Sequence, residues 1–176
     1  MTIQILYSSA EGQARRIAER MEDELRERGY RVQCESVADA VMRTKPHAVL
    51  LVASIHVGRH AAPARDLIRA NLALFNSIPS GFISVSLSAN EADRTRAQGY
   101  VTDFVAETGW RPRVTATVAG ALRYTRLNFI KKMIIRRIAS ENGLPTDTTR
   151  DHEFTNWDEV TGFVNAFEDA LLVKVR

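Results

Sequence analysis

The stretch that decides the fold is Ile5-Leu6-Tyr7-Ser8-Ser9-Ala10-Glu11-Gly12-Gln13-Ala14. Its apolar beginning predicts a short strand, and its hydroxyl-rich middle predicts a loop. The apolar residues that follow recur at helical spacing, which predicts a helix with these residues on one face: Ala14, Ile17, Ala18, Met21 and Leu25. Gly29 then favours the end of this helix, and a second strand is predicted around Val32, Cys34 and Val37. Together these elements form a βαβ unit.

The rest of the chain repeats the alternation of strands and helices. Every residue from Ala48 to Ala53 is apolar, as expected for a central parallel strand covered on both faces. Further strands are predicted over 82–87 and 114–119, and helices over 63–75, around 100–105 and over 157–171. This pattern predicts a three-layer α/β sandwich around a five-stranded parallel sheet in the order 2-1-3-4-5.

Composition places the chain among ordinary globular proteins. It has 176 residues, 45% hydrophobic and 26% charged, with no linker-like stretch, so we expect a single domain over 1–176. Neither a signal peptide nor a run of ~18 apolar residues is visible, and Cys34 is the single cysteine. The cytoplasm is therefore the expected compartment. A homo-oligomer is compatible with the sequence, which does not identify the oligomeric state.

Several nucleotide-binding classes do not match the first loop. A dinucleotide site would need G-x-G-x-x-G, a P-loop would need a Gly-Lys pair, and a phospho-receiver would need acidic residues after the first strand. A hydroxyl-rich loop at a helix N-terminus can instead hold a monophosphate through free amides. We therefore expect Ser8, Ser9 and the amides of Glu11, Gly12 and Gln13 to enclose the phosphate of flavin mononucleotide (FMN). The alternative is that Ser9 only caps the helix.

Two other loops should lie beside this one, because ligands of such sheets bind beyond the carboxyl ends of the strands. They follow the third and fourth strands and would flank the flavin ring, with the candidate residues Ser54, Ile55, His56, Val57, Gly58, Ser86, Leu87, Ser88 and Ala89.

The first loop resembles the FMN phosphate loop of flavodoxins. The runs Ala53-Ser54-Ile55-His56-Val57-Gly58-Arg59-His60, Trp110-Arg111-Pro112 and Ala119-Gly120-Ala121-Leu122-Arg123-Tyr124 are similar to the quinone-dependent protoporphyrinogen IX oxidase (dehydrogenase) family. This resemblance implies a flavodoxin-like fold, FMN bound by Ser8 to Ala14 including Ala10, oxidation of protoporphyrinogen IX in haem biosynthesis, and a membrane quinone as acceptor. Two departures predict looser FMN binding: Ala14 replaces a usual Thr, and Val57 replaces a frequent aromatic residue.

A long connection, 122–155, separates the fifth strand from the last helix, and we interpret it as a partly helical insertion. Apolar residues share one helical face at Leu127, Ile130, Ile134 and Ile138. The basic residues expected to contact a membrane or substrate propionates are Arg126, Lys131, Lys132, Arg136 and Arg137. Three interpretations stay open: peripheral contact with the anionic inner face of the cell membrane, attraction of porphyrinogen propionates, or packing on the domain with solvated charges. Nucleic-acid binding is not expected, because interleaved exposed aromatics are lacking.

The flavin would carry the redox chemistry, so no catalytic triad or metal site is predicted. The candidates for substrate or proton contacts are His56, Arg123 and Tyr124; His56 could equally be an ordinary loop histidine, and Arg123 a surface arginine. The alternative functions are an NAD(P)H:quinone reductase, a flavodoxin-type electron carrier and a non-redox interaction module. The net charge of +3 disfavours the carrier, since carrier flavodoxins are acidic.

Overall fold

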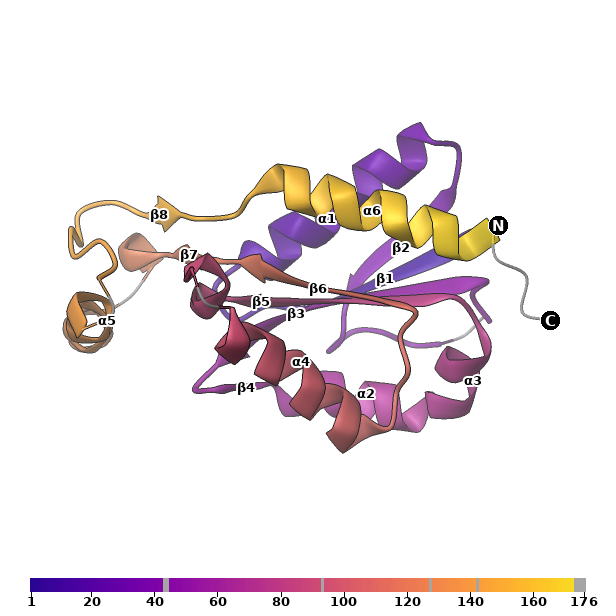
Figure 1. Ribbon diagram of the computed structural model, residues 1–176, viewed down its shortest axis with the longest axis horizontal. Helices are drawn as coiled ribbons and strands as arrows, with labels where there is room; N and C mark the ends of the chain where they lie inside the picture. The colour runs from indigo at the N-terminus through magenta and orange to yellow at the C-terminus, as the bar shows by residue number, and fades with distance from the viewer. Residues whose placement is uncertain (43–44, 93, 127, 142, 173–176) are drawn as a thin grey trace.

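A parallel β-sheet runs through the centre of the computed structural model (Figure 1), which describes residues 1–42, 45–92, 94–126, 128–141 and 143–172. Five described strands lie side by side in the order β2-β1-β3-β5-β6, all parallel. Their bounds are Thr2–Ser8 (β1), Arg31–Ser36 (β2), Ala48–His56 (β3), Ser80–Ser86 (β5) and Val114–Ala119 (β6). Numbered by parallel strands alone, this is the predicted order 2-1-3-4-5.

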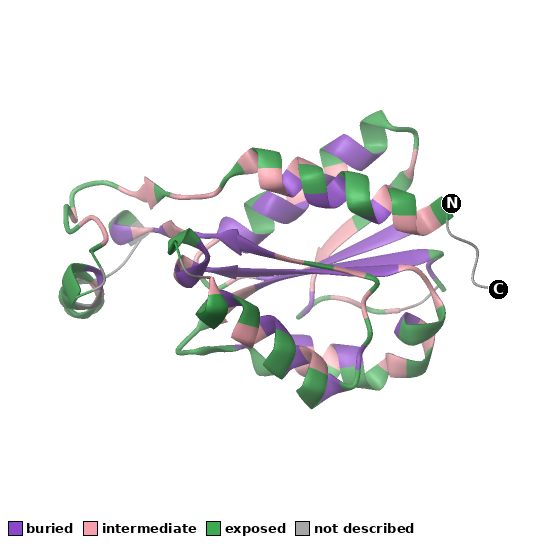
Figure 2. Cartoon of the chain, in the orientation of Figure 1, coloured by how far each residue is buried: buried purple, intermediate pink, exposed green. Residues whose placement is uncertain are grey.

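Helices cover both faces of the sheet (Figure 1). One face carries α1 and α6, and the opposite face carries α2, α3 and α4. Their bounds are Gln13–Glu27 (α1), Ala62–Ala70 (α2), Leu72–Ser77 (α3), Thr95–Thr108 (α4) and Trp157–Leu172 (α6). The three layers of the predicted sandwich are therefore present. Figure 2 shows the strands buried between the half-exposed helices.

Each face of the sheet has its own hydrophobic core. Against α1 and α6 the core includes Ile5, Met21 and Phe167, and all three are fully buried. On the other face, Phe82 and Trp110 pack within an aromatic cluster under α2 and α4. Because β1, β3 and β5 are covered on both sides, their side chains are buried nearly without alternation. This burial explains the continuous apolar run from Ala48 to Ala53 in β3.

The single helix predicted over 63–75 is divided into α2 and α3 at Asn71. The Asn71 side-chain amide donates to the carbonyl of Leu67 at 2.9 Å, which is a local alternative to continuing the helix. Two short elements complete this half of the molecule: β4 (Arg59–His60), which pairs with the end of β3, and the 3₁₀ turn η1 (Leu87–Asn90) after β5.

The connection from β6 to α6 extends beyond the carboxyl end of the sheet (Figure 1). It contains the strand β7 (Ala121–Leu122), the 3₁₀ turn η2 (Tyr124–Arg126), helix α5 (Phe129–Glu141) and the strand β8 (His152–Glu153). The two strands form an antiparallel pair, which brings both ends of the connection together. A helix is therefore present where the sequence predicts one. Within the described residues, no helix is long and apolar enough to cross a membrane.

Candidate functional site

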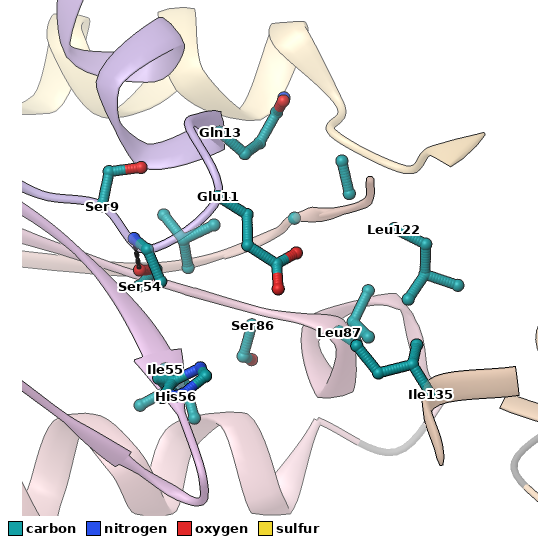
Figure 3. A pocket seen from close by; sticks show the side chains of 14 residues that line it. Ser9, Glu11, Gln13, Ser54, Ile55, His56, Ser86, Leu87, Leu122 and Ile135 are labelled. Carbon is teal, nitrogen blue, oxygen red and sulfur yellow. Dashed lines mark hydrogen bonds between the residues drawn. The ribbon is translucent and has the colours of Figure 1, made fainter. Parts of the chain in front are cut away.

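A cavity of about 210 Å³ opens at the carboxyl ends of the parallel strands, beside α5 (Figure 3). Its walls come from the loop after β1, from the ends of β3 and β5 and the turn after β5, from the chain after β6 and from α5. Ser54 to His56, predicted as a loop, belong to β3. The lining residues are Ser9, Ala10, Glu11, Gln13, Ser54, Ile55, His56, Val85, Ser86, Leu87, Gly120, Ala121, Leu122 and Ile135. The sheet order therefore joins the three loops that the sequence predicts to surround one ligand.

The loop after β1 and the start of α1 line this cavity with Ser9, Ala10, Glu11 and Gln13. Gly12 adopts a left-handed conformation (φ 94°) at the start of α1, and no side chain caps the helix. The Gly12 amide donates to Ser9 Oγ at 2.9 Å, and the Ala10 amide donates to Ser54 Oγ at 3.3 Å. An uncapped helix N-terminus beside a cavity is an environment that favours an anion. The interpretation of Ser9 as a simple cap of the first helical amides is not supported.

Hydroxyl groups from the neighbouring strands complete the polar part of the wall. Ser54 Oγ donates to the carbonyl of Ser8 at 3.2 Å, which ties the ends of β3 and β1. Ser86 is only 7% exposed, and its Oγ has no hydrogen-bond partner in the described structure although the residue lines the cavity. A buried hydroxyl without a partner is unfavourable, so a ligand with a polar atom at this position would be stabilised.

Other predicted contact residues do not line the cavity. Seven of the sequence candidates fall into this class: Ser8, Gly12, Ala14, Val57, Gly58, Ser88 and Ala89. Ala14 and Ala89 are fully buried in the core, whereas Val57 is 86% exposed at the tip of the β3–β4 turn. These residues position the loops; their direct contact with a flavin stays a prediction.

Glu11 and His56 are the titratable side chains that enter the cavity (Figure 3). Burial raises the pKa of Glu11, although the charges of His56, Lys131 and Arg123 act in the opposite direction. His56 lies at the exposed end of β3, consistent with its predicted place beside the ligand. His60, four residues later, is buried in the aromatic cluster and hydrogen bonded to Ser84 at 3.0 Å, so the two histidines do not converge. Among the described residues, no group of three potential metal ligands is present.

Arg123 belongs to a polar network that joins the start of α1 to the β7–β8 pair. Its guanidinium donates to Gln13 Oε1 at 2.6 Å and pairs with Asp151 at 3.4 Å and Glu153 at 3.7 Å. Gln13 also donates to Thr155 Oγ1 at 2.8 Å. The charge of Arg123 is thus balanced by two carboxylates, and the residue does not line the cavity. Its predicted contact with a propionate or phosphate is untested.

Tyr124 has a packing role in the structure. Its side chain is fully buried in a small hydrophobic cluster, and its hydroxyl donates to the carbonyl of Pro145 at 2.9 Å. Tyr124 is not among the residues that line the cavity. Its predicted contact with the substrate stays a prediction.

Helix α5 turns only part of its apolar surface toward the domain, and most of the predicted apolar face that is described is exposed. Ile135 and Ala139 face the domain, whereas Ile130 and Ile134 are 69% and 55% exposed. Phe129 and Met133 are exposed as well. The helix is apolar on more than one side, so the inward contacts are made by a different pair of residues. Leu127 lies outside the described residues, as do the side chains of Arg126 and Ile138.

Five lining residues were not identified from the sequence: Val85, Gly120, Ala121, Leu122 and Ile135. Gly120 to Leu122 directly follow the fifth parallel strand, so the rule that placed the other loops at this edge could have found them. Ile135 could not have been found, because its position depends on how α5 packs.

The class of protein is defined by this fold and by comparison with known proteins. A family model described as a flavodoxin domain matches residues 4–149. A solved flavodoxin from Pseudomonas aeruginosa superposes with a TM-score of 0.59, at 19% identity, over 97% of this chain and 99% of that chain. The chain is thus a flavodoxin-type α/β domain, a class that implies a flavin cofactor.

Comparison with curated proteins identifies the family within the flavodoxin class. The chain is 31% identical over 163 residues to protoporphyrinogen IX dehydrogenase [quinone] of Escherichia coli K12, covering 90% of both chains. It is 29% identical over 169 residues to the Leishmania major protein of the same name, covering 93% of this chain and 73% of the relative. The chain belongs to the quinone-dependent protoporphyrinogen IX dehydrogenase family.

The comparison with the flavodoxin also corrects one prediction. Because the superposition covers 97% of this chain, no long insertion after the fifth parallel strand is evident. The segment 122–155 is instead a connection of the fold, with its β7–β8 pair hydrogen bonded beside the sheet edge.

Proposed function

We propose that this protein oxidises protoporphyrinogen IX to protoporphyrin IX, a late step of haem biosynthesis, with FMN as the bound electron acceptor and a membrane quinone as the final one. The observation that carries this proposal is the cavity at the switch point of the sheet, in a chain 31% identical over 90% of its length to an enzyme of that name.

The residues of the cavity fit a flavin phosphate and ring. Free amides at the uncapped start of α1, around Glu11 and Gln13, would hold the phosphate. Ser54 and Ser86 offer hydroxyls, and the unpartnered Ser86 Oγ supports a polar ligand atom there. FMN would supply the two-electron acceptor, while the protein holds it and limits access of water.

The size of the cavity indicates where the tetrapyrrole would bind. A volume of about 210 Å³ is below the roughly 300 to 1,000 Å³ of sites that enclose a drug-sized ligand. The cavity is too small to enclose both the flavin and the macrocycle, so the macrocycle would lie across the mouth, against Leu87, Leu122 and Ile135. Lys131, whose charge acts on Glu11 in the cavity, would be near enough to attract a propionate.

Helix α5 would also bring the protein to the anionic inner face of the cell membrane. Its outer face, which we define as Phe129, Ile130, Met133 and Ile134, spans about 140° of the helix at 100° per residue. All four side chains are more than half exposed, and Figure 2 shows α5 exposed over most of its surface. Among the described residues, Lys131, Lys132 and Arg136 form no ion pair. At 100° per residue Arg136 borders the outer face, whereas Lys131 and Lys132 flank the inward-facing Ile135. A basic helix with an exposed apolar face is typical of peripheral membrane contact.

The reaction can be tested directly on purified protein. We expect flavin absorption bands after loading with FMN, and bleaching of these bands on anaerobic mixing with protoporphyrinogen IX. Colour should return when a quinone is added. Bleaching by NADPH but not by protoporphyrinogen would instead support an NAD(P)H:quinone reductase, and bleaching by neither would support an electron carrier.

A further inference from the structure

Glu11 is the single acidic side chain that lines the cavity in the described chain. It stands between Ala10 and Gly12, whose amides donate to Ser54 Oγ and Ser9 Oγ. Figure 3 shows its carboxylate pointing from this loop toward Leu87 and Ile135. A negative charge therefore extends into the cavity from the loop whose amides, in the proposed function, would hold a phosphate.

The groups around Glu11 do not neutralise it by direct contact. The charged or titratable groups that act on it are His56 at the end of β3, Lys131 on α5, and Arg123 and Asp151 beside the β7–β8 pair. Arg123 is already paired with Asp151 and Glu153. Within the part of the chain that the structure describes, Glu11 has no ion pair. Burial raises its pKa, which means that the ionised form is the less favourable one here.

A bound phosphate would make this arrangement more costly. FMN carries a phosphate whose charge approaches two negative units near neutral pH, whereas riboflavin has none. The phosphate and the Glu11 carboxylate would repel each other across a partly buried space. The ribityl chain and ring, which are common to both flavins, would be affected little.

We propose that Glu11 sets the preference of this site between phosphorylated and unphosphorylated flavin, by weakening the binding of FMN relative to riboflavin. This inference rests on the proposed function, because it requires a flavin in the cavity. It gives the carboxylate a role in cofactor retention: FMN is held by the loop amides against a repulsion that disappears when Glu11 is protonated.

The experiment compares Glu11→Gln with the wild type, using dissociation constants for FMN and riboflavin measured by flavin fluorescence on apoprotein. For charges of one and two units roughly 6 Å apart with water-like screening, Coulomb's law gives about a tenfold effect. We expect Glu11→Gln to bind FMN about tenfold tighter at pH 7.5 and riboflavin with unchanged affinity. Glu27→Gln, at the exposed far end of α1, removes the same charge and should change neither constant.

The pH dependence provides a second test. As the pH falls, Glu11 becomes protonated in the wild type, so the FMN affinities of wild type and Glu11→Gln should converge. Protonation of the phosphate lowers its negative charge and thus also lowers the ratio, so it acts in the same direction as protonation of Glu11. Equal FMN affinities at pH 7.5, or a ratio that does not fall with pH, would overturn the inference while leaving the proposed function intact. If the wild type bound neither flavin, both would fail.

Discussion

Removing the unpaired cations of α5 should weaken binding to anionic membranes by a predictable amount. The perturbation is the triple substitution Lys131→Gln, Lys132→Gln and Arg136→Gln. Arg137 is left unchanged because it pairs with Glu141 at 3.1 Å. Lys131 and Arg136 are exposed and Lys132 is half-buried, so the fold should not depend on them.

The magnitude follows from the number of free charges. A basic side chain near an anionic bilayer contributes about 1 kcal/mol. Three of them contribute about 3 kcal/mol, which corresponds to roughly a 150-fold change in affinity. The effect should decrease as salt is added, because screening shortens the reach of surface charges to about 10 Å at 0.1 M ionic strength.

The assay is sedimentation with vesicles of phosphatidylcholine, with and without phosphatidylglycerol. A matched control exists at the opposite edge of the sheet, where Arg31, Lys45 and Arg111 lie at or before the starts of β2, β3 and β6. Changing these three to Gln lowers the net charge equally. If both triple variants lost affinity to the same extent, net charge would explain binding; if the α5 variant kept wild-type affinity, the membrane role of α5 would be refuted.

Three further predictions concern stability of the apoprotein, measured by urea denaturation. Val57 is β-branched with φ 50°, so Val57→Asn should stabilise by about 1 kcal/mol; a loss of stability would contradict the strain. A Cβ at Gly81 would lie 2.7 Å from Leu50 Cδ2, so Gly81→Ala should destabilise by about 1–3 kcal/mol, whereas Gly162→Ala, with open space around it in α6, should stabilise by about 0.5–1 kcal/mol. Equal changes in the free energy of unfolding for Gly81→Ala and Gly162→Ala would show that the added methyl group at position 81 does not clash with Leu50. Burial lowers the pKa of His60 to about 4, so its protonation opposes folding and stability should be lost as the pH falls from about 6.5 to 4. In His60→Gln, the free energy of unfolding should fall by about 3 kcal/mol less over this pH range than in the wild type. An equal fall in both proteins would show that another group is responsible.

The parts of the site that local patterns determine were predictable from sequence. The strand, loop and helix around Ser9 and Gly12 are encoded in consecutive residues, and the structure places them as expected. Ser54 and Ser86 are thirty-two positions apart, yet they meet because parallel strands end at the same edge of a sheet. In these cases the sheet order brings locally predictable segments together into one site.

The parts that depend on tertiary packing were not predictable. Helix α5 carries apolar residues around most of its circumference, so periodicity could not decide which of them would face the domain. The structure uses Ile135 and Ala139, and exposes Ile130 and Ile134. Tyr124 follows β7 in a family-like motif, but its burial arises from the fold of the whole connection. Motif similarity located it without indicating its environment.

The two faces of α5 link the cavity to the exterior. Ile135 on the inner face lines the cavity, while Phe129 and Met133 on the outer face are exposed to the surroundings. Because one helix about 11 Å across separates them, a bilayer that contacts the outer face would lie next to the mouth of the cavity. A lipid-soluble quinone could then reach a bound flavin without crossing the aqueous phase. The proposed membrane contact of α5 and the proposed transfer of electrons to a quinone would therefore support each other.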